Sequence, residues 1–265
     1  MNYGMYVAAS GVLVNSHRMD VLANNLANVN TPGFKPQLAD IQARQPERIE
    51  DGPFDPDLSR QMLEQIGGGL FAAQHTTSYD AASIVDSGME LDVALTQANT
   101  FFAVQTADET TGELGVQLTR NGRFMRNDAG QITTQAGHPV LGEGDVPITI
   151  PGGTSQISIS NDGEVTFRGG DGEPVGSARL QVVTTDTTML EHRGEGFFHM
   201  AAGDHRTPVE HPGVRQFHYE GSGTNAVSTM MEIVAATKAA TGNANMIRYH
   251  DQMLNQSINT FARLG

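Results

Sequence analysis

Cysteine is absent from this 265-residue chain, which excludes disulfide bonds, zinc-thiolate sites and thiol nucleophiles together. Tryptophan is absent too, and aromatic residues make up only 6%, so we expect no deep aromatic core. The chain is long enough, and at 38% hydrophobic residues apolar enough, to bury a core. The composition therefore indicates a globular protein with one large domain or two small ones.

Basic residues are scarce. Sixteen Lys and Arg stand against 30 Asp and Glu, a formal charge of -14, and the lysines are Lys35 and Lys238 alone. Such an excess of negative charge repels phosphate backbones and anionic lipid surfaces. We therefore expect no nucleic-acid partner.

Long hydrophobic runs are also missing. The apolar stretch from Met5 to Val14 is too short for a membrane span, which needs roughly 20 apolar residues. No Lys or Arg precedes it and its helical periodicity continues beyond it, unlike in a signal peptide. If the protein leaves the cytoplasm, we expect export without a cleaved signal peptide.

The sequence offers no catalytic constellation: it contains no GxxxxGK loop, no HExxH pair and no GxSxG elbow. Five of the nine histidines lie between His192 and His218, but their spacings of seven, six, six and seven residues do not match a helical zinc pair. We expect no enzyme activity, no metal, no cofactor and no small-molecule substrate. The competing hypotheses are a secreted metal-dependent enzyme that uses the His192 to His218 region and an extracellular ligand-binding β protein.

Both ends of the chain carry a heptad-like pattern. Alternating steps of three and four residues meet mostly apolar side chains near the N-terminus and again from Ala226 onward, as in a coiled-coil seam. The N-terminal seam is Met5, Ala8, Val12, Asn15, Met19, Leu22, Leu26 and Val29, and the C-terminal seam is Met230, Ile233, Thr237, Ala240, Ala244, Ile247, Asp251, Leu254, Ile258 and Phe261. Neither helix can bury its seam alone.

Two arrangements satisfy this pattern: the helices pair with each other as an antiparallel bundle, or they dock with helices of neighbouring subunits. Small seam residues such as Ala8 and Ala240 permit close helix approach. Further apolar positions lie off the seams, and they indicate more than one packing face: Val7, Val14 and Val21 on the first helix and Met231, Val234 and Met246 on the second. These features favour contacts between subunits.

Four asparagines lie in the stretch ANNLANVNTPGFK, residues 23–35, where the first helix pattern ends. Asparagine is a weak helix former, so Asn24, Asn25 and Asn28 need compensation. Either the helix frays toward the breaker NTPG, or the amides hydrogen-bond across a subunit seam and fix its register. The residues alone leave both interpretations open.

The middle of the chain alternates short apolar runs with turn signals, as an antiparallel all-β unit does. The clearest hairpin is QISIS-NDG-EVTF, which places Ile157, Ile159, Val165 and Phe167 on one face. FFAVQT, ITIP and ARLQVVTTD predict further strands. Residues 36–69, with four prolines and scattered charges, are the predicted linker.

The N-terminal stretch resembles the signature of the bacterial flagellar axial family, which comprises the basal-body rod and hook proteins. The matching positions are Ala8-Ala9-Ser10-Gly11, Asp20-Val21, Asn24-Asn25-Leu26-Ala27-Asn28, Thr31, Gly33 and Phe34. LDVAL, FFAVQTAD, LTRNGRF, NDAGQITTQAGHPVLGE and VPITIP follow the family's order, nearest to the proximal rod type. Thr100 stands where the family usually has glycine, and YEGSGTNAVSTMMEI keeps the C-terminal motif only in part.

Residues and resemblance together predict an α+β fold, with terminal helices pairing as a coiled-coil-like domain and a central antiparallel all-β domain. The predicted divisions are an N-terminal helix of the axial inner domain at 1–35, the linker at 36–69, a β-rich outer domain at 70–217 and a C-terminal helix of the inner domain at 218–265. The resemblance implies that the terminal helices pack in the inner tube of the axial structure. The asparagines then belong to an interface between subunits.

The resemblance implies a structural subunit that is exported by the flagellar type III apparatus and built into the periplasmic rod. There it would assemble with itself and other rod proteins into a helical tube that transmits torque; the distal rod protein is the alternative within the family. The predicted assembly interface is Met5, Ala8, Val12, Met19, Leu22, Asn24, Asn25, Leu26, Asn28, Val29, Met230, Ile233, Ala240, Ala244, Ile247, Leu254, Ile258 and Phe261, and the family-signature turn is Thr31, Pro32, Gly33 and Phe34.

Overall fold

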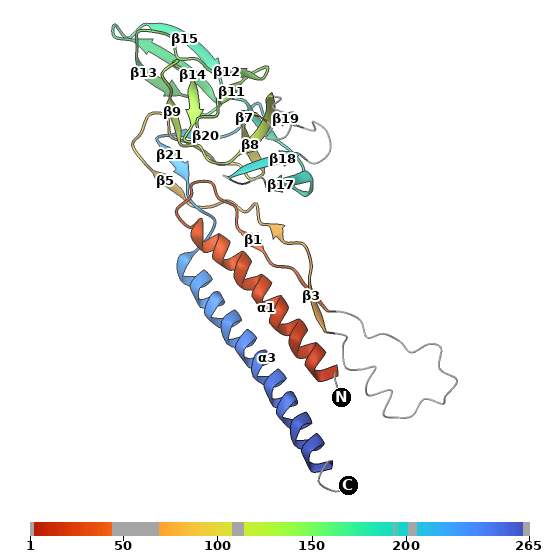
Figure 1. Ribbon diagram of the computed structural model, residues 1–265. Coiled ribbons are helices and arrows are strands. Elements are labelled where there is room, and N and C mark those ends of the chain that lie inside the picture. Colours follow the sequence, from red (N-terminus) through yellow and green to blue (C-terminus); the bar gives the residue numbers. More distant parts are fainter. Residues whose placement is uncertain are drawn as a thin grey trace, which may run out of the picture. The chain divides into compact units, whose positions relative to one another are not determined.

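A computed structural model describes residues 3–43, 69–107, 114–192, 194, 196–200 and 206–261. The chain forms two compact units (Figure 1). The helical unit comprises Met1–Ala27, Gln37–Thr77 and Asn225–Gly265, and the β unit comprises Asn28–Pro36 and Ser78–Thr224. Terminal helices with antiparallel strands between them make this an α+β fold, as the sequence predicted.

The helical unit is built on α1 (Tyr3–Ala27) and α3 (Ala226–Phe261), which lie side by side (Figure 1). The helices run antiparallel, because Gly4 lies next to His250 and Gly11 lies next to Asn243. Two pairs of short antiparallel strands complete the unit: β1 (Gln37–Leu38) with β4 (Thr76–Thr77), and β2 (Ile41–Ala43) with β3 (Leu70–Ala72). Strands β1 and β2 therefore occupy the start of the predicted linker, whose residues 44–68 lie outside the described residues.

An asparagine sets the start of α3. The Oδ1 of Asn225 accepts hydrogen bonds from the backbone N–H groups of Val227 at 3.0 Å and Ser228 at 3.2 Å, which caps the first turn. The helix therefore begins at Ala226 and not at residue 218, where the sequence placed the C-terminal element. Within the described part of the chain, neither helix is both long and apolar enough to cross a membrane.

The β unit contains a six-stranded antiparallel sheet in the order β17-β18-β8-β7-β16-β19 and a three-stranded sheet in the order β13-β14-β15. The six strands are β7 (Thr100–Ala107), β8 (Leu114–Thr119), β16 (Val182–Thr184), β17 (Leu190–His192), β18 (Phe197–Met200) and β19 (Thr207–Pro208). The three strands are β13 (Thr154–Ile159), β14 (Glu164–Gly169) and β15 (Pro174–Arg179), and the 3-10 turn η1 (Thr187–Met189) precedes β17.

Four antiparallel strand pairs complete the β unit. They are β5 (Ile84–Asp86) with β21 (His218–Glu220), β6 (Val93–Leu95) with β20 (Val214–Gln216), β9 (Phe124–Arg126) with β10 (Ile132–Thr134), and β11 (Leu141–Gly142) with β12 (Val146–Pro147). Two of these pairs join the beginning of the unit to its end, because β5 and β6 pair with β21 and β20.

The core of the β unit lies on both faces of β7. Phe101 and Ala103 belong to one apolar cluster, whereas Phe102 and Val104 belong to another, as the two-residue period of a strand requires. Phe101 packs against Phe198 with ring centres 5.5 Å apart. On the other face Phe102 packs against Phe124 with ring centres 5.1 Å apart, so aromatic rings pack on both faces of this strand.

The predicted QISIS-NDG-EVTF hairpin is confirmed: β13 pairs with β14, with Ile157 opposite Phe167 and Ile159 opposite Val165. All four side chains are buried. The strand prediction for ITIP is wrong, because Thr149 makes only an isolated bridge. The flanking Ile148 and Ile150 N–H groups donate to Val140 and Gly130, so no single partner strand continues a ladder there.

Candidate assembly surface and buried polar cluster

The two helices approach closely where glycines face polar side chains. A Cβ built on Gly11 would lie 2.4 Å from Asn243 Nδ2, and one built on Gly4 would lie 2.8 Å from His250 Nε2. Gly4 and Gly11 are seven residues apart on α1, and Asn243 and His250 are seven apart on α3; this spacing is about two helical turns. Glycine therefore supplies the space that Asn243 and His250 occupy between the helices.

The side of α3 that packs on α1 follows steps of three and then four residues from Ala226. It comprises Thr229, Ile233, Ala236, Ala240, Asn243, Ile247, His250 and Leu254, which are all buried or half-buried. The predicted C-terminal seam took the steps in the opposite order, so it shares only every seventh residue with this side: Ile233, Ala240, Ile247 and Leu254. Met230, Ala244 and Ile258 are exposed, and the side chain of Phe261 lies outside the described part.

The N-terminal seam residues that lie in α1 are all at least half-buried: Met5, Ala8, Val12, Asn15, Met19, Leu22 and Leu26. A second side of α1 faces the short strands, since Leu70 N donates to Ser10 Oγ at 3.2 Å. Val14 and Val21 follow Ser10 along this side and are 3% and 6% exposed. Within one chain, α1 is therefore covered both by α3 and by the strand pairs.

The asparagines near the end of α1 have separate environments. Asn25 is buried, and its side-chain amide donates to the Gln37 carbonyl at 2.7 Å and accepts from the Gln37 N–H at 2.9 Å. Asn24 is exposed. Asn28 accepts a hydrogen bond from the Thr31 hydroxyl at 3.1 Å, and Val29 beside it is half-buried in the β unit. Asn25 thus compensates for its weak helix propensity by ordering the chain at β1.

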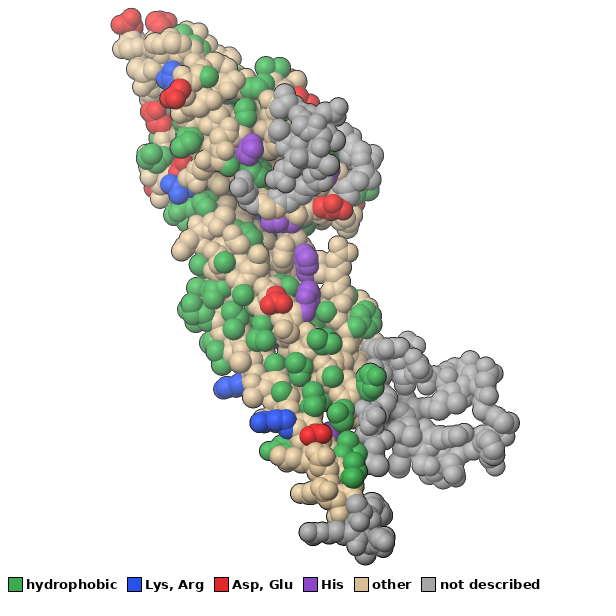
Figure 2. Space-filling model, viewed as in Figure 1, with side chains coloured by type: hydrophobic (Ala, Val, Ile, Leu, Met, Phe, Trp, Pro, Cys, Tyr) green, Lys and Arg blue, Asp and Glu red, His purple; other side chains and the backbone are tan. Residues whose placement is uncertain are grey.

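An apolar stripe remains uncovered on the side of α3 away from α1. We call it the outer stripe; its members are Val227, Met230, Met231, Val234, Met246, Tyr249 and Met253, which are between 52% and 69% exposed. On α1, Tyr6 and Leu13 are 74% and 71% exposed. Figure 2 shows hydrophobic side chains gathered over the helices with few charged side chains among them. Exposed apolar side chains gathered on one side of a helix are typical of a surface that binds another protein.

The signature turn is an integral part of the β unit. Gly33 has φ +67°, and a Cβ built there would lie 2.4 Å from the carbonyl carbon of Arg120, so only glycine fits. Its N–H donates to the Glu220 carbonyl at 2.8 Å. Phe34 is 2% exposed and meets the ring of His192 edge-on at 6.3 Å. Thr31 and Pro32 are half-buried.

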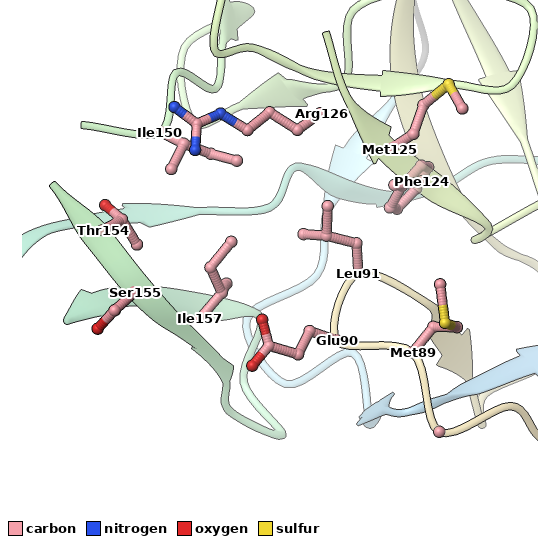
Figure 3. A pocket seen from close by; sticks show the side chains of 11 residues that line it. Met89, Glu90, Leu91, Phe124, Met125, Arg126, Ile150, Thr154, Ser155 and Ile157 are labelled. Carbon is pink, nitrogen blue, oxygen red and sulfur yellow. The ribbon is translucent and has the colours of Figure 1, made fainter. Parts of the chain in front are cut away.

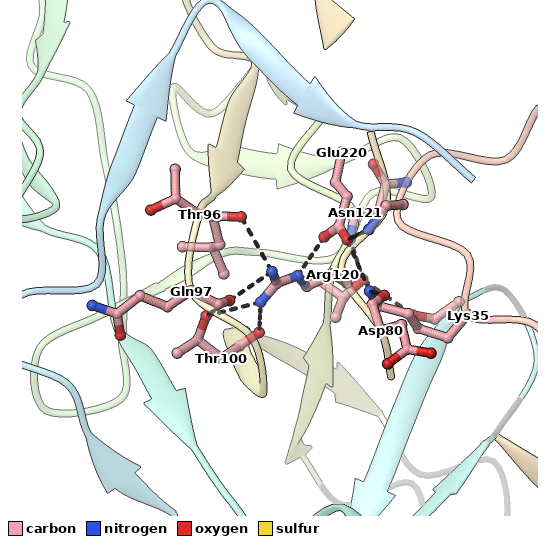
Figure 4. Close-up of polar contacts among 12 residues, drawn as sticks. Lys35, Asp80, Thr96, Gln97, Thr100, Arg120, Asn121 and Glu220 are labelled. Carbon is pink, nitrogen blue, oxygen red and sulfur yellow. Dashed lines mark hydrogen bonds and ion pairs between the residues drawn. The ribbon is translucent and has the colours of Figure 1, made fainter. Parts of the chain in front are cut away.

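The residue after this turn enters a buried ion cluster (Figure 4). Lys35 Nζ donates to Glu220 Oε1 at 2.8 Å and to the Asp80 carbonyl at 2.6 Å. Arg120 Nε donates to the second carboxylate oxygen of Glu220, and all three charged side chains are 2% exposed. Glu220 therefore lies between two cations that come from distant parts of the sequence.

Arg120 is held from its other side by β-unit backbone. Its guanidinium donates to the carbonyls of Leu95 at 3.1 Å and Gln97 at 2.7 Å, and to the hydroxyl of Thr100 at 2.8 Å. Thr100 is the residue where the sequence departs from the family's usual glycine. Its hydroxyl gives the buried cation one further acceptor, which a glycine would lack.

Burial lowers the pKa of Lys35, and the neighbouring Glu220 carboxylate offsets part of that effect. Without the Glu220 carboxylate, burying the charged lysine in this site would be unfavourable. Such a cluster stabilises the fold, because removing Glu220 would leave two buried cations without their shared carboxylate.

A hollow of about 580 Å³ lies in the β unit beside β9 and β13 (Figure 3). Leu91, Phe124 and Ile157 line its apolar part, while Glu90 and Arg126 lie on opposite sides of it (Figure 3). Glu90 and Arg126 are the charged residues of its lining.

The histidines proposed for a metal site have other surroundings. His192 packs edge-on against Phe34 and Phe198, and His218 Nδ1 lies 2.7 Å from a backbone carbonyl. His211 Nδ1 lies 2.8 Å from Asp162 Oδ1, and His205 is outside the described residues. Among the residues that the structure describes, no three His, Asp or Glu side chains gather as metal ligands do. The metal-enzyme hypothesis therefore finds no geometric support.

Two family models match the chain. Residues 5–35 match the model of the flagella basal body rod protein, and residues 96–167 match the D1 domain of the flagellar hook protein FlgE/F/G. The first match spans α1 and the signature turn, and the second covers the centre of the β unit. Together they define the class as the flagellar hook and rod proteins.

Curated relatives narrow this class. The flagellar basal-body rod protein FlgF of Escherichia coli is 32% identical over 253 residues, which cover 90% of each chain. FlgG of Caulobacter vibrioides, also a flagellar basal-body rod protein, is 30% identical over 260 residues, 93% of this chain and 95% of the relative. The chain belongs to the flagellar basal-body rod protein family. The chain is thus similar to both types, FlgF and FlgG, at nearly the same identity.

Proposed function

We propose that this chain is a structural subunit of the flagellar basal-body rod that assembles with copies of itself and with other rod proteins. The outer stripe of α3 is the observation that supports it, because a rod subunit needs an apolar surface left free for its neighbours. Repetition of a contact between two different surfaces builds an open helical tube when the rotation does not close. Such a tube would transmit torque to the hook and filament.

In this proposal α1 and α3, the helices of the predicted inner-domain regions, form the inner domain of the tube, where they pair in a coiled-coil-like manner with those of neighbours. The β unit forms the outer domain. We assign the chain to the proximal rod type, with the distal type as the alternative. The amino-acid sequence of the central segments, from LDVAL to VPITIP, supports the proximal assignment.

The predicted interface residues divide into two groups under this proposal. Exposed members such as Met230 and Ala244 would contact neighbouring subunits directly. Buried members such as Ala8 and Leu22 would act indirectly, by holding α1 against α3 so that the outer stripe is presented on a stable helix pair.

We further propose that the flagellar type III apparatus exports the chain and that the rod is completed in the periplasm. The lack of cysteine suits that compartment, because an oxidising environment would cross-link exposed thiols.

The test is complementation of a strain that lacks the gene, followed by electron microscopy of isolated basal bodies. Val234→Asp puts a charge into the middle of the outer stripe, and we expect it to leave rods missing or truncated. Ser257→Asp adds the same charge at an exposed polar position of the same helix and should restore rods and swimming.

Circular dichroism of both purified variants should match the intact protein, so that lost rods report lost contacts and not a lost fold. Normal rods with Val234→Asp would contradict the assignment of the outer stripe as the subunit contact.

A further inference from the structure

Every sulfur atom of this protein is the thioether sulfur of a methionine, since the chain has 12 methionines and no cysteine. Four methionines lie on the outer stripe: Met230, Met231, Met246 and Met253 are 52%, 65%, 52% and 54% exposed. Met5 and Met19, which lie on α1, are half-buried. More than half of the outer stripe's seven members are therefore exposed methionines.

Methionine is well suited to a contact that must fit an irregular partner, because its unbranched thioether adapts to the shape of the opposing surface. The same sulfur is the side chain's chemical weakness. Oxidation to the sulfoxide converts a flexible apolar group into a polar one. On the outer stripe this change would place polar S=O groups where an apolar partner has to dock.

We propose that the four outer-stripe methionines are a modification site for peroxides, at which reversible oxidation blocks docking of the subunit. Hydrogen peroxide transfers one oxygen atom to the thioether: the O–O bond breaks, an S=O bond forms, sulfur loses two electrons and water leaves. The inference rests on the proposed function, because it requires the outer stripe to be the docking surface.

The physical cause of the block is desolvation. A sulfoxide oxygen is a strong hydrogen-bond acceptor, and burying it against apolar side chains removes its water without providing a donor. Because the four residues share one helix side, several such oxygens would enter one contact. Reduction by a methionine sulfoxide reductase would restore the thioethers and with them the contact.

The β unit provides an internal comparison. Met89, Met125 and Met189 are 61%, 47% and 39% exposed, so peroxide reaches them as well. They lie outside the outer stripe, and their oxidation should leave docking unchanged. Substitution by leucine preserves apolar volume and removes the oxidisable sulfur.

The experiment uses the full-length chain, treated with hydrogen peroxide and mapped by peptide mass spectrometry. Self-assembly is measured as the protein concentration at which half of the chain sediments as assembled material. One variant carries leucine at Met230, Met231, Met246 and Met253, and the matched control carries leucine at Met89, Met125 and Met189. After peroxide we expect the intact chain and the matched control to need at least tenfold more protein, and the outer-stripe variant to be unchanged.

Two results would overturn the inference while leaving the proposed function intact. One is unchanged assembly of the intact chain although all four sulfoxides are present. The other is an outer-stripe leucine variant that loses assembly on peroxide treatment as fully as the intact chain does. A chain that assembles equally well with Val234→Asp, before any peroxide is added, would instead remove the proposed docking surface itself.

Discussion

Single residues of the signature turn connect the family motif to the interior of the β unit. Gly33 fits where no other residue can, Phe34 is buried, and Lys35 reaches Glu220 at 2.8 Å across 185 positions of sequence. The motif therefore has a role within the subunit. The sequence could reveal Gly33 through its turn chemistry, but not the ion cluster, since the pairing of Lys35 with Glu220 depends on how distant strands meet.

Lys35→Met should destabilise the β unit by about 1.5–3 kcal/mol at neutral pH, which is typical for losing a hydrogen bond between charged groups. The destabilisation should also depend on pH. The pKa of Lys35 is lowered in the folded chain, so between that value and the unfolded value of 10.5 the unfolded chain binds a proton that the folded chain lacks. The free energy of unfolding contributed by Lys35 therefore rises with pH in this window.

Urea unfolding of the intact chain and of Lys35→Met, from neutral pH to about pH 10, measures this difference. Subtracting the free energy of unfolding of Lys35→Met from that of the intact chain cancels the titration of groups far from the cluster. The charged groups that face residue 35, which are Glu220, Arg120 and Asp80, are present in both proteins. Curves that stay parallel over the whole range would show that the Lys35 pKa is the same in folded and unfolded chains.

At the scale of elements, the sequence predicted both terminal helices and the α+β class but missed part of the helix contact. The apolar steps from Ala226 led through Met230 and Ala244, yet the structure turns Thr229, Asn243 and His250 toward α1. Hydrophobic periodicity favours the more apolar side of a helix. It could not detect that Gly4 and Gly11 make room for polar side chains, although their seven-residue spacing was visible.

Gly11→Ala tests this close approach. A Cβ at residue 11 would meet Asn243 at 2.4 Å, so the helices must shift, and we expect a loss of unfolding free energy despite alanine's better helix propensity. Gly242→Ala is the matched control, since a Cβ there meets nothing within 4 Å. It should stabilise the chain by roughly 0.5–1 kcal/mol.

Thermal and urea unfolding followed by circular dichroism measure both variants. Adding Asn243→Ala to Gly11→Ala should recover most of the lost stability, because it removes the clashing group. Equal stabilisation by Gly11→Ala and Gly242→Ala would mean that the helices do not pack closely at residue 11.

The whole molecule is strongly acidic, with a formal charge of -14, while its outer stripe is apolar. These two properties act against each other in assembly, because like-charged subunits repel at long range whereas apolar surfaces attract only on contact. Charge would thus keep separate subunits apart, and the surface that joins them would draw little of its affinity from ion pairs.

Salt should therefore promote assembly. Between about 0.01 M and about 0.1 M sodium chloride the Debye length falls from about 30 Å to about 10 Å, which screens repulsion between subunits. We expect the concentration for half-maximal assembly to fall by about tenfold, equivalent to about 1.4 kcal/mol. Sedimentation across this range measures it, and weaker assembly at higher salt would indicate ion-paired contacts in place of an apolar one.

The contact between Lys35 and Glu220 has a topological consequence for the β unit. The chain first enters this unit at Asn28, returns to the helical unit over Gln37–Thr77, re-enters at Ser78 and finally leaves after Thr224. Lys35 lies near the first entrance and Glu220 near the final exit, and their side chains touch at 2.8 Å. Entrance and exit are therefore neighbours, as in domains that tolerate insertion into a host chain. Ser78–Thr224 could therefore be enlarged or trimmed in evolution while the helices and Gln37–Thr77 are kept.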